Sequence, residues 1–195
     1  MEDVYCAALA DLLSYEAPQG VPLLREAFGS LEKAWKAGTG DLKEAGLWNP
    51  ALDKVWQSPH RRNLPERIWD WCEHHQARVI SRWNPDYPVL VDQLAAPPPV
   101  LYVKGTLPDQ PACVAVVGSR KATDYGLAVA ARFARTAALR QVPVISGGAY
   151  GIDAAAHSSP SVFIVILSSS IRMFLMNTEE KNRISSAHCI GISAA

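Results

Sequence analysis

The sequence predicts an α/β protein in which a small helical domain precedes an incomplete Rossmann-like domain with a doubly wound parallel sheet. All six tryptophans lie before residue 84, in a stretch whose apolar residues recur at helical spacing. Seven prolines fall within residues 81–112, and they exclude a long helix there. From residue 113 onward, apolar strands alternate with glycine-rich turns and helices. That order is typical of a parallel sheet with helical crossovers.

Short helices are expected in the N-terminal domain, residues 1–80, because apolar residues recur there every three or four positions. Ser30 is a suitable N-cap, and Pro65 fits the first turn of a helix whose apolar side carries Ile68, Trp69 and Cys72. We expect the Trp and Leu side chains to bury one another in a core, since a partner surface is the less common use of such spacing. The expected helices cover residues 4–13, 22–28, 31–37 and 65–76.

Charge is balanced over the whole chain, with 19 Lys+Arg against 19 Asp+Glu. A net charge of zero argues against a nucleic-acid partner, because such binders usually carry a basic surface. The sum hides a difference between segments: residues 1–80 carry −3, residues 81–157 carry +2 and residues 158–195 carry +1. The mildly basic middle segment therefore keeps nucleic acid open as a partner.

Four cysteines lie far apart, and no C-x-x-C pair is present; they are Cys6, Cys72, Cys113 and Cys189. Neither a zinc knuckle nor a disulfide framework is indicated, so free thiols and a cytoplasmic location are expected. The first residues are not expected to form a signal peptide, and no apolar run reaches the roughly 18 residues of a membrane span. His74 and His75 diverge on a helix, which favours solvated surface over a metal pair.

Prolines make residues 81–112 a stiff connection between the two domains. Within it, Val100–Val103 is flanked by Pro99 and Gly105 and is expected to form a short strand.

The segment from residue 113 predicts two strands, each followed by a helix. Val114–Val117 is a continuous apolar run typical of a buried parallel strand, and residues 142–145 form the second, with Pro143 near its start. A helix capped by Thr123 or Asp124 follows the first strand. Its small residues can lie close on a sheet; they are Leu127, Ala130, Ala131, Ala134 and Ala138.

Two glycine-rich turns follow these strands and are expected side by side at the carboxyl edge of the sheet, where doubly wound folds bind ligands. Glycines there let backbone N–H groups approach a phosphate, and an Arg supplies a fixed cationic fork. The alternative is that the glycines only turn the chain tightly. Asp153 suits a structural role, because a carboxylate repels an anion. The candidate phosphate-binding residues are Gly118, Ser119, Arg120, Ser146, Gly147, Gly148 and Gly151.

The runs VAVVGSRKATDYG and VISGGAYGIDAAAH, preceded by DYPVLVDQLAAPPPVLYVKGTL, resemble the DprA/Smf family of DNA-processing proteins of natural transformation. The resemblance covers residues 84–157 in order. In addition, LLREAFGSLEKAW is similar to the helical SAM-like domain that precedes this core in many members.

This resemblance implies a cytoplasmic protein that binds single-stranded DNA without sequence preference and loads the RecA recombinase on it, with no enzymatic activity and no cofactor. The GSR match gives Arg120 the phosphate-clamping role, with Ser119, Ser146, Gly147 and Gly148 as the cradle. Further candidates for DNA contact are Lys121, Tyr125 and Arg132, although Lys121 suits solvated surface equally well. His157 is expected to pack or to hydrogen-bond at a helix end rather than to act as a base.

After His157 the family pattern breaks. Residues 158–195 hold nine serines and one glycine, which favours a shifted reading frame or a truncation over divergence. The expected domains are 1–80, 81–112, an incomplete core over 113–167 and a divergent tail over 168–195, with a third strand at 161–167. Because the family's dimerisation and RecA contact depend largely on the later region, neither is expected to carry over residue by residue, and RecA remains a partner only through the resemblance. We expect DNA binding weaker than in a complete member, or absent.

A nucleotide-processing enzyme of the lysine-decarboxylase-like (LOG) fold is the alternative, since it shares a glycine-rich Rossmann-like core. Such enzymes need a catalytic Glu near the phosphate loop, yet residues 114–195 hold only Glu179 and Glu180. An NAD oxidoreductase ranks third, because residues 136–140 lack the acidic residue that would hold a ribose.

Overall fold

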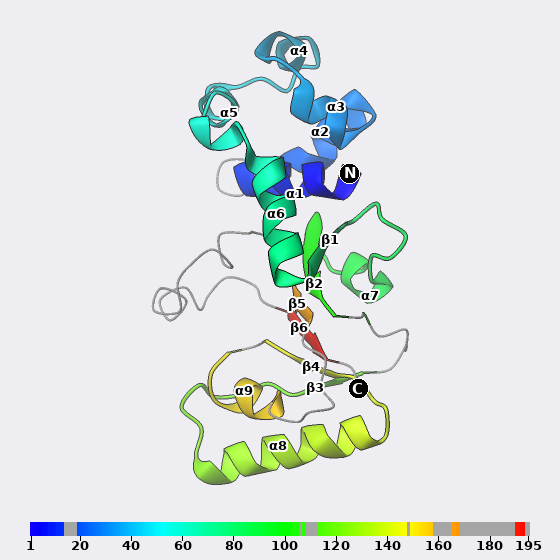
Figure 1. The fold of residues 1–195 in the computed structure, drawn as a ribbon, viewed down its shortest axis with the longest axis vertical. Coiled ribbons are helices and arrows are strands. Elements are labelled where there is room, and N and C mark those ends of the chain that lie inside the picture. Colours follow the sequence, from blue (N-terminus) through cyan, green and yellow to red (C-terminus); the bar gives the residue numbers. More distant parts are fainter. Residues whose placement is uncertain are drawn as a thin grey trace. The chain divides into compact units, whose positions relative to one another are not determined.

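The structure is a computed structural model that describes residues 1–13, 19–105, 107, 113–147, 149–157, 165–167 and 190–193 (Figure 1). The described residues form two compact units, and the boundary between Leu101 and Tyr102 lies inside a strand. None of the described helices has the length and apolar character needed to cross a bilayer.

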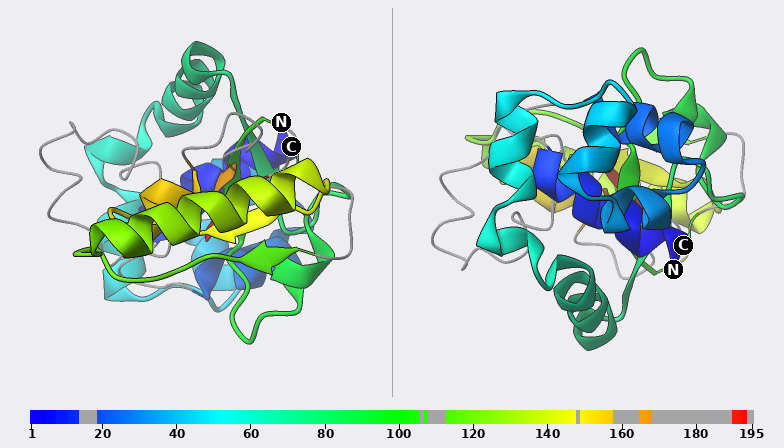
Figure 2. Two further views of the ribbon diagram at one scale, coloured as in Figure 1. Left: turned by 90° about the horizontal axis from the view of Figure 1, so that it is seen from below. Right: turned by 90° about the horizontal axis from the view of Figure 1, so that it is seen from above.

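Helix α1 (Glu2–Leu13) is the centre of the first unit. It contacts α2 (Gly20–Phe28), α3 (Leu31–Lys36), α5 (Pro50–Trp56), α6 (Leu64–His75) and β1 (Ala77–Ser81) (Figure 2, right). The helices expected in this region are thereby confirmed. The remaining elements of the segment are α4 (Thr39–Glu44), the 3-10 helix η1 (Pro59–Arg61), α7 (Val89–Asp92) and β2 (Val100–Lys104), which pairs with β1.

Local sequence signals account for the ends of these helices. The hydroxyl of Ser30 accepts a hydrogen bond from the backbone N–H of Lys33 over 3.1 Å, so the predicted N-cap of α3 is confirmed. Pro65 lies in the first turn of α6, where a missing N–H costs nothing, and Gln76 ends that helix in the left-handed conformation.

The core of the first unit is mainly aliphatic, which corrects the expectation of a tryptophan core. Trp56 is 4% exposed and donates from Nε1 to the carbonyl of Ala37, so burial is confirmed for this residue. Trp48 and Trp69 are 39% and 48% exposed, and for them the expectation is wrong. Aliphatic side chains fill the interior instead, among them Leu9, Leu13, Leu24, Leu31, Leu42 and Ile68.

The N-terminal carboxylates tie α1 to later segments of the same unit. Glu2 accepts a hydrogen bond from the backbone N–H of Leu31 over 2.7 Å. Asp3 accepts from the backbone N–H of Ser81 and from the side-chain amide of Asn84, over 2.9 and 2.8 Å. These bonds satisfy backbone and side-chain donors that folding takes out of water.

The second unit holds a four-stranded sheet in the order β3-β4-β6-β5. Strand β3 (Val114–Ala115) pairs in parallel with β4 (Val144–Ser146), as the sequence predicts. The strand is shorter and less buried than the expected run Val114–Val117, since Ala115 is exposed and Val117 is 68% exposed. Strand β6 (Ile190–Ser193) lies antiparallel to both β4 and β5 (Val165–Leu167), so the sheet is mixed and departs from the expected all-parallel arrangement. The third strand expected within 161–167 is present as β5, and the remainder of that range lies outside the described residues.

Helix α8 (Asp124–Leu139) packs on α9 (Ile152–Ala156) and β4, and Figure 2 (left) looks directly onto it. Its first turn is capped by the hydroxyl of Thr123, which accepts from the N–H of Gly126. Ala130, Ala134 and Ala138 are buried, which confirms the predicted small-residue stripe. Ala130 and Ala134 belong to a core cluster with Val116, Val144 and Ala156.

Candidate nucleic-acid interface

Parallel pairing of β3 and β4 places the two glycine-rich turns next to each other. Val114 is in register with Val144, and Ala115 with Ile145. Both strands therefore end at the same edge of the sheet, where one turn leads to α8 and the other to α9. This is the edge at which sheets of this type bind ligands.

Asp153, in the first turn of α9, joins the two turns. Its Oδ1 accepts a hydrogen bond from the N–H of Gly118 over 3.3 Å, and its Oδ2 accepts from the N–H of Ala149 over 3.4 Å. The side chain is buried, so these bonds form with little competition from water. The structural role expected for Asp153 from the sequence is confirmed.

Ser119 adds a second connection between the turns. Its carbonyl oxygen accepts from the N–H of Ile152 over 3.2 Å, and its hydroxyl accepts from the N–H of Lys121 over 3.1 Å. Together with the bonds to Asp153, these contacts occupy the N–H groups of Gly118, Lys121, Ala149 and Ile152. Among the residues expected to form the phosphate cradle, Gly118 is the one whose N–H group these bonds occupy. Arg120 and Lys121 add positive charge at the same turn.

Two glycines have a steric reason to be glycine. Gly151 has a φ of +79°, and a Cβ there would overlap the carbonyl oxygen of Ser119. A Cβ on Gly118 would lie 2.7 Å from the Cγ1 atom of Ile152. Close packing of the two turns thus requires both glycines, whether or not a phosphate binds there.

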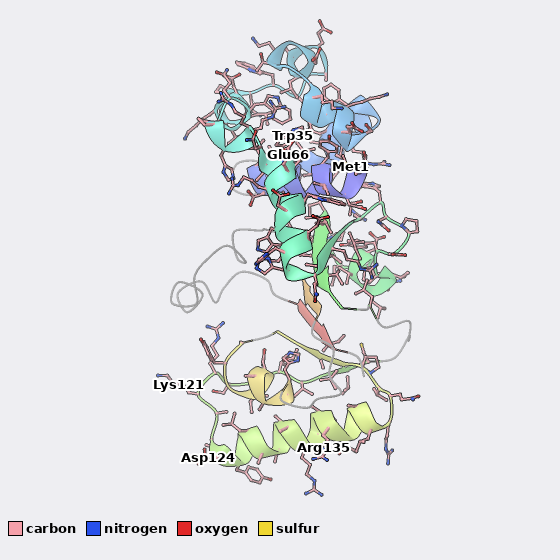
Figure 3. All side chains as sticks on the ribbon, in the orientation of Figure 1. Met1, Trp35, Glu66, Lys121, Asp124 and Arg135 are labelled. Carbon is pink, nitrogen blue, oxygen red and sulfur yellow. The ribbon has the colours of Figure 1, made fainter. Side chains whose placement is uncertain are left out.

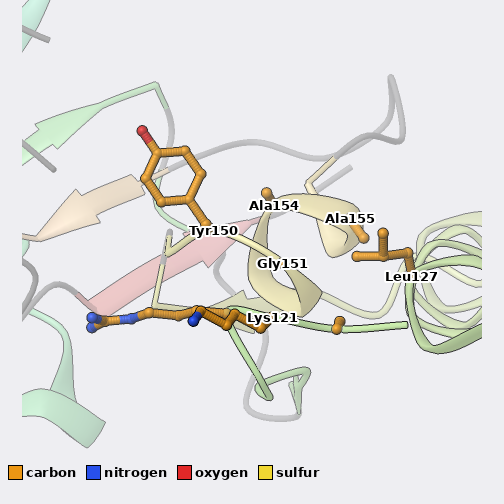
Figure 4. Close-up of a pocket in the computed structure, with 8 residues that line it drawn as sticks. Lys121, Leu127, Tyr150, Gly151, Ala154 and Ala155 are labelled. Carbon is orange, nitrogen blue, oxygen red and sulfur yellow. The ribbon is translucent and has the colours of Figure 1, made fainter. Parts of the chain in front are cut away.

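An open pocket of about 550 Å³ lies between the turns. Figure 4 shows Tyr150 and Ala154 on the α9 side of this pocket and Leu127 on α8. Its walls combine two cations with small apolar side chains. The lining residues are Arg120, Lys121, Ala122, Leu127, Tyr150, Gly151, Ala154 and Ala155.

The pocket brings together three of the predicted site residues: Arg120, Lys121 and Gly151. Lys121 is exposed on the turn that precedes Asp124, the first residue of α8 (Figure 3). Four other candidates belong to the turns but do not line the pocket: Gly118, Ser119, Ser146 and Gly147. Two more lie on α8 outside the pocket, namely Tyr125 and Arg132. Gly148 lies outside the described residues.

Tyr150 and Leu127 line the pocket, although neither is among the site residues expected from the sequence. Tyr150 is 64% exposed. The sequence contains a signal that points to Tyr150, because this residue lies inside the run S-G-G-A-Y-G, and the glycines of that run are among the expected site residues.

Two side chains near the site have buried polar atoms without a hydrogen-bond partner among the described residues. They are Ser146, at the end of β4, and His157, directly after α9. Burial lowers the pKa of His157, and the negative charge of Asp153 partly opposes this effect. The imidazole is therefore held in its neutral form to a lower pH than usual.

Other candidates from the sequence do not form a site in the described part of the chain. His74 and His75 are exposed, with their rings 4.9 Å apart, and no three His, Cys, Asp or Glu side chains among the described residues gather to hold a metal ion. Cys6 and Cys72 are buried free thiols, and burial raises the pKa of Cys72 to about 11.

Comparison with known proteins supplies independent information. The sequence profile of the family described as DNA recombination-mediator protein A matches residues 78–187, a range that extends beyond His157. The protein Smf of Synechocystis is 34% identical over 145 residues, which cover 70% of this chain and 35% of that protein. A putative DNA processing protein DprA of Mycobacterium tuberculosis is 62% identical over 47 residues, 24% of this chain and 12% of that protein.

The chain thus spans about a third of the length of Smf. The profile match includes both glycine-rich turns and the pocket between them, and it covers more than half of the chain. This chain belongs to the DprA/Smf family of DNA-processing proteins.

Proposed function

We propose that this chain binds single-stranded DNA in the cytoplasm during DNA processing for recombination, with its phosphates at the pocket between the two glycine-rich turns. The observation that carries the proposal is the convergence of Arg120 and Lys121 with Tyr150 and Gly151 on one pocket. Family membership supports it, because the related proteins are named for DNA processing and recombination mediation.

Electrostatics favour phosphate as the group bound by the two cations. The Arg120 guanidinium offers several N–H donors in a fixed plane, and Lys121 adds a second positive charge next to it in the chain. Contacts of this kind recognise the charge of the phosphate groups and not the base sequence. The binding should therefore tolerate any base sequence and weaken as salt concentration rises.

The proposal is for binding and not for catalysis. Asp153 is the acidic side chain that joins both turns, and its two oxygens already accept backbone hydrogen bonds. Burial lowers the pKa of His157, at the end of α9. The contacts of Asp153 support a positioning role for this residue.

Resemblance to the DprA/Smf family extends the proposal to the loading of RecA on the bound strand, as part of natural transformation. A pull-down of RecA by the chain bound to oligo-dT tests this extension. Retention of RecA only when DNA and the chain are both present would support it. Equal retention by DNA alone would contradict it, while leaving DNA binding itself unaffected.

Fluorescence anisotropy with labelled oligo-dT tests the binding site. Charge-assisted bonds to phosphate are worth about 1.5–3 kcal/mol, so Arg120→Ala should weaken binding by roughly 10- to 100-fold. The salt slope should also fall by about 0.7 for each phosphate that the variant no longer neutralises. Arg140→Ala is the matched control, because this residue caps the opposite end of α8 and its replacement removes the same charge.

Equal binding by the Arg120→Ala and Arg140→Ala variants would overturn the site assignment. Absence of any binding to oligo-dT by the unaltered chain would overturn the function. Chromatographic detection of base release from a nucleoside monophosphate would instead favour the LOG-type enzyme.

A further inference from the structure

Helix α8 presents an apolar surface to solvent on the side that faces away from the sheet. Its alanine stripe packs inward on β4 and α9, and Figure 2 (left) looks onto the opposite face. Four large apolar side chains are exposed on this helix: Tyr125 by 80%, Val129 by 47%, Phe133 by 54% and Leu139 by 75%. Single exposed apolar residues are ordinary, whereas four on one face of one helix indicate a contact surface.

The exposed residues of α8 follow the spacing of a helix-pairing seam. Tyr125, Val129, Arg132, Thr136 and Leu139 succeed one another at intervals of four, three, four and three. Positions spaced in this way lie in a line along a helix, and they correspond to the a and d positions of a coiled coil. The Thr136 hydroxyl donates to the backbone carbonyl of Arg132 over 2.8 Å, so it needs no acceptor from a partner. The element that fits such a seam is a second helix.

Three arginines give the same face a positive charge. Arg132 lies at the middle of the seam, and Arg135 and Arg140 stand at the flanking g and e positions. All three are exposed, and in the part of the chain that the structure describes none of them forms an ion pair. The helix holds one acidic residue, Asp124, at its first position. Because e and g residues select a partner helix by charge, this face favours an acidic one.

A second copy of α8 does not meet these requirements. Arg132 is the midpoint of the seam, so it would face the Arg132 of the other copy whether the helices ran parallel or antiparallel, and the like charges would repel. A DNA strand also fits poorly, since its phosphates would lose water against the aliphatic side chains of Val129 and Leu139.

We propose that the outward face of α8 binds an amphipathic helix of a partner protein, with apolar residues along its seam and Asp or Glu beside them. Tyr125, Val129 and Leu139 supply the apolar contact, and Arg135 and Arg140 pair with the carboxylates. These residues do not line the pocket between the glycine-rich turns, so the partner helix and the DNA occupy separate surfaces.

Fluorescence anisotropy with two labelled peptides of about three heptads tests this surface on the full chain. Both peptides carry Leu at a and d; the first has Glu at e and g, and the second has Lys there. The like charges keep each peptide from pairing with itself. The Glu peptide should bind roughly tenfold more tightly than the Lys peptide, and its binding should weaken as the salt concentration rises.

Charge reversal on α8 should reverse this preference. Arg135→Glu replaces an exposed attraction with a repulsion, so it should weaken binding of the Glu peptide roughly threefold to tenfold and strengthen binding of the Lys peptide. Arg62→Glu is the matched control, because it makes the same change at an exposed position of the first unit and should alter neither affinity.

The apolar part of the seam is tested by Leu139→Ser. This variant should weaken binding of the Glu peptide roughly tenfold, since it removes a large apolar side chain from the contact. Leu90→Ser removes the same side chain from α7, where it is also exposed, and should have no effect. Both leucines lie at the surface, so neither variant removes a core contact.

Several results would overturn the inference. They are absence of binding of the Glu peptide to the unaltered chain, equal affinity for the Lys peptide, and equal effects of Arg135→Glu and Arg62→Glu. If Arg135→Glu weakens binding of oligo-dT more than Arg62→Glu does and leaves the Glu peptide unaffected, then the face is a nucleic-acid surface and the proposal is wrong.

Discussion

The carboxylate of Asp153 accepts a hydrogen bond from the backbone N–H of Gly118, 35 positions earlier in the chain, over 3.3 Å. Its other oxygen accepts from the N–H of Ala149. One acidic side chain, 5% exposed, thereby holds together the ends of two neighbouring parallel strands. The relative position of Arg120 and Tyr150 across the pocket depends on this connection.

Substitution of Asp153 by Asn should therefore destabilise the second unit. The amide has one oxygen, and its NH₂ group would face a backbone donor, so a buried N–H group would lose its acceptor at a cost of about 1–3 kcal/mol. Urea unfolding measures the loss. Asp70→Asn, on the exposed side of α6, is the control and should change the free energy of unfolding by less than about 0.5 kcal/mol. Equal losses in the two variants would contradict the bridging role.

Gly151→Ala should lower the free energy of unfolding by more than about 1 kcal/mol, because the residue has a φ of +79° and the new Cβ would overlap the carbonyl oxygen of Ser119. Gly40→Ala provides the contrast. No heavy atom lies within 4 Å of a Cβ built there, and the residue is helical, so the free energy of unfolding should rise by about 0.5–1 kcal/mol. Thermal unfolding of the Gly151→Ala and Gly40→Ala variants tests this prediction. Similar unfolding midpoints would contradict it, because they would show that the two turns can move apart without loss of stability.

Local signals in the sequence predict much of this fold. Thr123 and the alanine stripe define α8, while Ser30 and Pro65 locate the starts of α3 and α6. Parallel pairing of β3 with β4 follows from the strand–helix–strand order. In each case the determining contact is made by residues close in sequence, or by a connection whose handedness is fixed.

Non-local contacts account for what the sequence does not predict. Trp69 follows helical apolar spacing, yet it is half exposed, because α6 buries Ile68 and Cys72 instead. Antiparallel pairing of β6 beside β4 depends on residues more than 40 positions apart. Tyr150 lines the pocket because its turn packs on Ser119, and the sequence marks this turn only through its glycines and not through the tyrosine itself.

Asp3→Ala should destabilise the first unit by about 2–4 kcal/mol. This carboxylate accepts hydrogen bonds from the N–H of Ser81, which is buried, and from the side chain of Asn84. Its removal leaves the Ser81 N–H group without an acceptor. Urea unfolding followed by tryptophan fluorescence measures the change, since all six tryptophans lie within residues 1–83. Asp70→Ala is the exposed control, and a destabilisation no larger than in this control would refute the prediction.

Stability of the second unit should fall as the pH is lowered, and His157 should account for part of that fall. Burial lowers the pKa of His157 in the folded chain, whereas in the unfolded chain the ring titrates near about 6.5. Between these two values the unfolded state binds more protons, so the free energy of unfolding decreases as the pH drops through this window. His157→Asn cannot titrate there and should lose less stability between about pH 7.5 and about pH 5. Urea unfolding at several pH values measures the slopes, with His74→Asn as the control because His74 is exposed. If His157→Asn and the unaltered chain show the same slope, burial of the imidazole does not contribute to acid sensitivity.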